Sequence, residues 1–129
     1  IAENRFYVDS QSSMFFLSPF KNFTTSWVVS HSFNEYVYET KIKKNFEEGY
    51  IWVPSRENEI TLQILRNVLD KRGHWKPKSY QRVFQLMPQI NQKELEKSIS
   101  LVLPYAKKIV SSLYSGDLNS VNKYSLGGL

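Results

Sequence analysis

Hydrophobic and polar positions follow two different patterns along this chain, and the pattern changes near Pro54. Before Pro54, short runs of aromatic and apolar residues are separated by turn-forming stretches, which is typical of β-strands. After it, apolar residues recur at helical spacing. The change predicts an α+β fold, in which an N-terminal antiparallel β-meander of four or five strands packs against three or four C-terminal helices.

The predicted strands are short. Residues 5–9 and 13–18 are rich in aromatic and apolar side chains and indicate a hairpin, and residues 24–30 have the β-branched and aromatic composition of a third strand. A last short strand is expected over residues 50–53, where Pro54 stops it.

Residues 35–43 fit two patterns. Tyr36, Tyr38 and Thr40 alternate with other residues at period two, which favours a strand, whereas Phe33 and Val37 belong to a spacing that marks one face of a helix. The alternation is the cleaner pattern, and we predict a strand here.

The second half reads as helices. Ser55 can cap a first helix with an apolar stripe through Ile60, Ile64 and Val68, which ends at Gly73. Because Pro77 excludes a helix over residues 74–78, a short second helix is expected to start at Ser79 and to close at Pro88.

A further helical stripe starts after Asn91, which precedes Glu94 by three residues as an N-cap does, and continues to Leu113. Pro104 predicts a kink or two consecutive helices there. The chain is thus expected to be a single domain over residues 1–129. Its sheet-rich half covers residues 5–53, its helical half residues 55–115, and residues 116–129 form a loosely attached tail.

Composition narrows the class of protein. The chain has 129 residues and no cysteine, which excludes disulfide frameworks and thiolate zinc sites and is compatible with the cytoplasm or an organelle matrix. Its longest apolar runs are far shorter than a membrane span, so no membrane partner is expected. Residues 1–54 hold five Lys and Arg against six Asp and Glu, and residues 55–129 hold twelve against six. The basic second half therefore indicates an anionic partner.

The candidate site is the segment 70–82, where basic residues gather beside two flat rings. Lysines and arginines can neutralise phosphates, and Trp75 and Tyr80 offer planes on which unpaired bases can stack, so single-stranded nucleic acid is the favoured partner and an acidic protein the next. Alternatively, the segment is a solvated connection in which Trp75 turns inward as an anchor. The predicted partner-binding residues are Arg66, Lys71, Arg72, His74, Trp75, Lys76, Lys78, Tyr80 and Arg82.

Three residues offer a catalytic alternative. His31 at the end of a predicted strand, His74 in the basic segment and Lys41 are the groups that a metal-independent ribonuclease needs to move protons and to stabilise charge. Nothing in the sequence draws the two histidines together, so we predict that they do not form a dyad. No metal-ligand spacing and no phosphate-binding glycine loop is present, and no metal or cofactor is expected.

These observations favour a non-catalytic binding module that engages an anionic partner, nucleic acid or an acidic protein face, through its basic second half. A small inhibitor or immunity-type protein, or an assembly protein acting through protein contacts, is an alternative, because a small sheet with surplus aromatic residues can present an edge or a ring patch to a partner. The ribonuclease of His31 and His74 is the enzymatic alternative.

Overall fold

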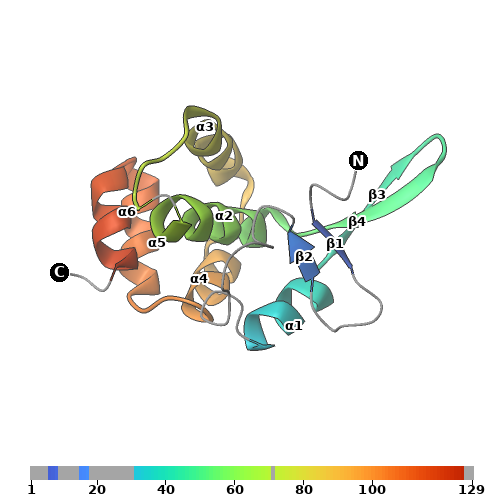
Figure 1. Cartoon of the computed structure of the whole chain (residues 1–129), viewed down its shortest axis with the longest axis horizontal. Helices are drawn as coiled ribbons and strands as arrows, with labels where there is room; N and C mark the ends of the chain where they lie inside the picture. Colours follow the sequence, from blue (N-terminus) through green and yellow to red (C-terminus); the bar gives the residue numbers. More distant parts are fainter. Residues whose placement is uncertain (1–5, 9–14, 18–30, 71, 127–129) are drawn as a thin grey trace. The chain divides into compact units, whose positions relative to one another are not determined.

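The structure is a computed structural model that describes residues 6–8, 15–17, 31–70 and 72–126 (Figure 1). The chain divides into two compact units, Ile1–Ser55 and Arg56–Leu129. We call them the N-terminal unit and the helical unit, and each is described by itself. The strand predicted over residues 24–30 lies outside the described residues.

The described strands of the N-terminal unit form two separate antiparallel pairs. β1 (Phe6–Val8) pairs with β2 (Phe15–Leu17), and β3 (Ile42–Phe46) pairs with β4 (Gly49–Val53) across a turn of two glutamates. The predicted meander of four or five strands is therefore wrong. Helices dominate the described residues, and the α+β class holds only loosely.

The helix α1 (His31–Glu39) occupies most of the segment for which the sequence predicted a strand. Its buried apolar residues are Phe33, Tyr36 and Val37, at the spacing i, i+3 and i+4 that places them on one face of a helix. The period-two alternation was the wrong choice here, because it counted the exposed Tyr38 as equivalent to the buried Tyr36. His31 consequently begins a helix and does not close a strand.

The helical unit contains five α-helices in its described part. They are α2 (Arg56–Ile64), which continues into a π-helical turn (Leu65–Asp70), then α3 (Pro77–Leu86), α4 (Gln92–Ser100), α5 (Ala106–Ser115) and α6 (Leu118–Ser125). A short 3₁₀ turn, Met87–Gln89, follows α3 at the position where Pro88 was expected to close it.

Helix packing builds one apolar core in this unit. α2 packs against α3 and α4, while α5 packs against α4 and α6 (Figure 1). The predicted stripes face that core. The fully buried apolar residues include Ile60, Ile64, Val68, Leu95, Ile99, Ile109 and Val121. A buried hydrogen bond of 2.6 Å between the hydroxyl groups of Thr61 and Ser98 links α2 to α4.

Local signals set the helix ends in the second half. The Asn91 side chain accepts a hydrogen bond of 3.0 Å from the amide of Glu94, which confirms the predicted N-cap. At Pro104 the chain forms two helices, since α4 ends at Ser100 and α5 begins at Ala106.

The loosely attached tail predicted for residues 116–129 does not describe residues 118–125. They form α6, which packs on α5 and buries Val121 completely. The Gly, Ser and Asn content concealed this helix, because Val121 is the one fully buried apolar residue that α6 places on an existing core.

Candidate functional site

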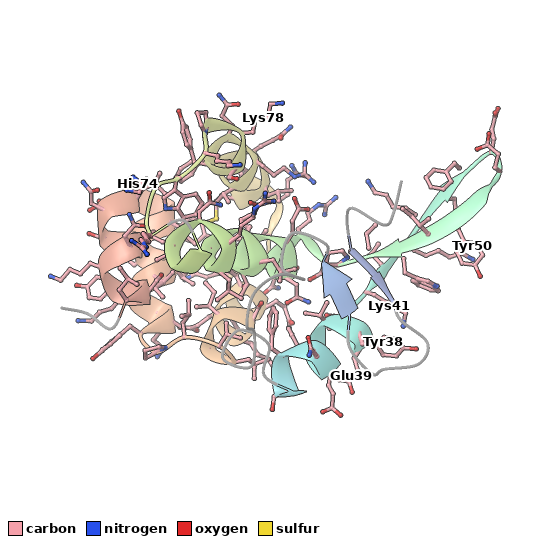
Figure 2. All side chains as sticks on the ribbon, in the orientation of Figure 1. Tyr38, Glu39, Lys41, Tyr50, His74 and Lys78 are labelled. Atoms are coloured by element: carbon pink, nitrogen blue, oxygen red, sulfur yellow. The ribbon has the colours of Figure 1, made fainter. Side chains whose placement is uncertain are left out.

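Most of the predicted partner-binding residues lie on the basic loop, which we define as residues 72–78. The side chains of Arg72, His74, Lys76 and Lys78 are exposed, and the residues Gly73 and Trp75 between them are half-buried. Figure 2 shows His74 on the loop and Lys78 at the start of α3. The loop thus presents cationic and imidazole groups on its outer side.

Asn67 fixes the loop from the preceding π-helical turn. Its side chain is fully buried, its Oδ1 accepts a hydrogen bond of 3.1 Å from the amide of Lys76, and its Nδ2 donates one of 2.8 Å to the carbonyl of Gln63. The backbone carbonyl of Asn67 also accepts a hydrogen bond of 3.0 Å from the amide of Gly73. One residue therefore holds both ends of the segment that carries His74.

Asn122 on α6 fixes the middle of the loop. Its Oδ1 accepts a hydrogen bond of 2.8 Å from Trp75 Nε1, and its Nδ2 donates one of 3.1 Å to the carbonyl of Gly73. A Cβ on Gly73 would lie 3.0 Å from that Nδ2, and Gly73 has a φ of +83°. Glycine is therefore required here by both the backbone conformation and the close approach of the amide.

Trp75 serves as an anchor. Its indole is half-buried and bonded to Asn122, which favours the interpretation in which the ring turns inward over the one in which it receives a base. Tyr80, on α3, is 36% exposed and keeps a ring surface accessible. The structure thus separates the two rings that the sequence placed together.

The remaining predicted cations differ in availability. Arg82 donates hydrogen bonds of 2.6 Å and 3.1 Å to the two carboxylate oxygens of Glu59, and this pairing raises the pKa of Arg82 above its ordinary value. Its charge is already matched. Arg66 is half-buried on the π-helical turn, and Lys71 lies outside the described residues. Within the described residues, Arg72, Lys76 and Lys78 make no ion pair, so their charges face solvent.

The groups of the catalytic alternative belong to different units. His31 begins α1 and Lys41 follows it in the N-terminal unit, while His74 lies in the helical unit. Lys41 Nζ lies 3.7 Å from the centroid of the Tyr38 ring and 4.9 Å from that of Trp52, and it donates a hydrogen bond of 3.2 Å to the carbonyl of Tyr38 (Figure 2). These contacts give Lys41 a local role beside aromatic rings. The absence of a dyad stays a prediction.

The surface of the β3–β4 hairpin contains none of the residues predicted to bind a partner. The pairing register places Lys43, Trp52 and Tyr50 on one face, where the Tyr50 and Trp52 rings meet edge to face at 5.9 Å and Lys43 Nζ lies 4.3 Å from the Tyr50 centroid. The opposite face carries the exposed Ile42, Phe46 and Ile51, which share it with Lys44. Residues 50–53 alternate between aromatic and aliphatic side chains (Tyr, Ile, Trp, Val), and this period-two pattern was the signal for a two-faced ribbon.

The described part of the chain holds no cluster of three or more His, Asp or Glu side chains arranged to hold a metal ion. Of the helices described, none combines the length and the apolar character that crossing a membrane requires. Comparison of the chain with protein families, with curated proteins and with solved structures finds no match in any of the three.

Proposed function

We propose that the helical unit is a non-catalytic binding module that engages the phosphates of a nucleic acid through the basic loop. The observation that supports this most is the way the loop is held. Hydrogen bonds with the side chains of Asn67 and Asn122 order the backbone of the loop. The cationic side chains of Arg72, Lys76 and Lys78 remain exposed and form no ion pair with an acidic group in the described residues. An ordered array of cations loses less conformational freedom when it binds a polyanion than a flexible one does.

The net charge of the unit supports the same partner class. Residues 56–129 hold twelve Lys and Arg against six Asp and Glu, so the long-range field of the unit attracts anions. Phosphate contacts from exposed cations position a protein on nucleic acid and depend little on base identity. The proposal is therefore sequence-independent binding, with an acidic protein face as the next partner. A location in the cytoplasm or an organelle matrix stays a prediction.

One observation favours the alternative of a protein that acts through protein contacts. Ile42, Phe46 and Ile51 are exposed on one face of the β3–β4 hairpin, and an isolated two-stranded hairpin is marginally stable in water. A protein partner that covers this face would support an inhibitor, immunity-type or assembly role. The ribonuclease alternative has no such observation in its favour.

A salt titration tests the proposal. Binding of labelled single-stranded RNA, single-stranded DNA and duplex DNA is measured by fluorescence anisotropy at several salt concentrations. Three phosphates neutralised by Arg72, Lys76 and Lys78 give a slope of roughly −2 in log K against log salt for a single strand. A flat slope, or no binding at low salt, would remove nucleic acid as the partner and leave an acidic protein.

A matched pair of variants tests the place of binding. Lys76→Glu combined with Lys78→Glu should lower affinity at least about 10-fold and reduce the slope by roughly 1 to 2, since two phosphate contacts are lost. The control combines Arg56→Glu with Lys123→Glu, which makes the same change in net charge at two exposed positions of the unit outside the loop. Equal losses in the two double variants would show a general charge effect and refute a site on the loop.

A further inference from the structure

A shallow groove runs between α4 and α5, on a part of the helical unit that the basic loop does not include. Two adjoining hollows form it, and they share Lys93, Glu96 and Lys107. Lys97 and Tyr105 line the first hollow, and Tyr114 lines the second. The groove is therefore continuous along α4 and α5, which pack against each other.

Positive charge dominates the lining of this groove. Lys93 and Lys97 are one helical turn apart on α4, and Lys107 faces them from α5, against Glu96 as the acidic side chain among the lining residues. Lys93 and Lys107 make no ion pair with a described residue. Two facing rows of lysine suit an extended chain of negative charge better than a single small anion, because the charge is spread along the groove.

An exposed tyrosine ring stands toward each end of the groove. Tyr105 is 48% exposed and Tyr114 is 51% exposed. Tyr105 is the N-cap of α5 and Tyr114 lies in its last turn, so the two residues lie near opposite ends of that helix. The two rings thus bracket the lysines and offer flat apolar surfaces to a ligand that lies along the groove.

The backbone of Tyr105 gives an independent indication. Tyr105 has a φ of 60° and a ψ of 35°, in the left-handed region that a bulky side chain rarely adopts. Tyr105 is the N-cap of α5, and about half of its ring is exposed to solvent. The ring is held beside Tyr124 of α6, with a centroid separation of 6.0 Å. Strain at an exposed residue of this kind is found preferentially at functional sites.

We infer that the groove binds single-stranded nucleic acid, with the phosphates near Lys93, Lys97 and Lys107 and with bases stacked on Tyr105 and Tyr114. The lysines alone would equally suit an acidic peptide. The paired exposed rings favour nucleic acid, because every base has a planar face that stacks on an aromatic side chain. The inference stands on residues outside the basic loop and goes beyond the proposed phosphate contacts there.

The experiment separates stacking from charge. Affinity is measured by fluorescence anisotropy for a labelled deoxythymidine dodecamer and for an abasic sugar-phosphate chain of the same length. Tyr105→Ala combined with Tyr114→Ala should weaken binding of the dodecamer at least about 10-fold and leave binding of the abasic chain unchanged. Tyr105→Phe combined with Tyr114→Phe should retain the affinity for both probes, since the ring surface is kept.

Three controls keep the result specific. Leu126→Ala removes an exposed apolar side chain of the same unit outside both the groove and the basic loop, and it should change neither affinity by more than about 2-fold. Tyr114→Ala alone alters a helix surface position without touching the strained Tyr105, so it reports on stacking even where the double variant is unstable. Lys93→Glu combined with Lys107→Glu should weaken binding of both probes.

The basic loop and the groove give distinguishable failures. The Lys76→Glu, Lys78→Glu variant could lose binding of both probes while the tyrosine variants keep the affinity of the unaltered protein. That result would support binding at the loop and overturn binding in the groove. Equal affinity of the unaltered protein for the dodecamer and the abasic chain would also overturn the groove, since no base contact would then exist. A polyglutamate chain that binds as tightly as the dodecamer and depends on both tyrosines would move the groove to an acidic protein partner.

Discussion

At the scale of single residues, two asparagines decide how the basic loop is presented. Asn67 and Asn122 together bond to Gly73, Trp75 and Lys76, and the hydrogen bonds from Asn122 span 47 and 49 residues of sequence. Neither asparagine stands out in the sequence, because a polar residue on a helix ordinarily faces solvent. Asn67 is fully buried and Asn122 is half-buried, and their hydrogen bonds with the loop are what make them informative.

Replacing Asn67 by Ala should therefore loosen the loop. The buried side chain loses a donor and an acceptor, and the amide of Lys76 loses its partner, so the free energy of unfolding should fall by about 1 to 3 kcal/mol. Hydrogen exchange followed by NMR should show faster exchange at the Lys76 amide. Asn119→Ala, at an exposed position of α6, serves as the control and should alter neither quantity appreciably. Unchanged exchange at Lys76 would contradict the fixing role of Asn67.

At the scale of elements, α6 depends on a local cap that its composition concealed. Asp117 Oδ1 accepts a hydrogen bond of 3.1 Å from the amide of Ser120, and its Oδ2 accepts one of 2.7 Å from the Ser120 hydroxyl. These bonds favour the charged carboxylate, and the side-chain bond from Ser120 followed by the backbone bond lowers the pKa of Asp117 below its ordinary value. The cap is therefore linked to pH.

The sign of that linkage follows from the direction of the shift. Because the pKa is lower in the folded chain, the contribution of Asp117 is complete above the ordinary aspartate pKa of about 4, and it is lost as the pH falls through the lower folded value. Urea unfolding at pH 6, 4 and 2 should show that Asp117→Asn, which keeps an accepting oxygen without titrating, loses less stability in acid than the unaltered protein. Identical acid sensitivity of the two would show that Asp117 titrates in the folded chain as in the unfolded one.

The helices of the second half were the most predictable elements, and the reasons are local. The stripe through Ile60, Ile64 and Val68, the cap at Asn91 and the break at Pro104 each act within a few residues. The segment 35–43 was not predictable in this way, because Tyr, Val and Thr suit either element and burial decides between them. α1 forms since Phe33, Tyr36 and Val37 are buried together on one face of the helix.

The site was predictable only in part. Features that depend on local sequence could be predicted, and features that depend on contacts between distant residues could not. Charge is additive along the sequence, so the basic character of residues 72–78 could be read directly. The role of Trp75 could not, because its partner Asn122 lies in a segment expected to be a loose tail. The groove of α4 and α5 was equally hidden, since Tyr105 and Tyr114 come together with Lys93 only when the two helices pack.

At the scale of the whole molecule, the net positive charge and the proposed binding residues are concentrated in one unit. Residues 1–54 carry a net charge of −1 by five Lys and Arg against six Asp and Glu, and the basic loop and the groove both lie in Arg56–Leu129. The hydrogen bonds that fix the loop join residues of that unit alone. The sequence predicted one domain over residues 1–129, and that stays a prediction, yet everything the proposed binding needs lies after residue 55.

The fragment 56–129 should therefore fold and bind without the N-terminal unit. Its core includes the fully buried Ile64, Leu95, Ile109 and Val121, drawn from four helices, and a domain of this length can be stable although only marginally so. We expect cooperative urea unfolding followed by circular dichroism, and an affinity for the deoxythymidine dodecamer within about 3-fold of the full chain. The affinity should be retained, because the fragment keeps all the residues proposed to contact phosphates and bases.

A second fragment, residues 56–115, gives the matched comparison. It lacks α6, so it exposes the core around the missing Val121 and removes the amide of Asn122 from Trp75 and Gly73. We expect it to unfold at lower urea than 56–129 and to bind more weakly, because an unanchored loop must be ordered on binding. Unfolding of 56–129 without a cooperative transition would show that the core of the helical unit depends on the N-terminal unit. Equal stability of the two fragments would instead show that α6 is not part of that core.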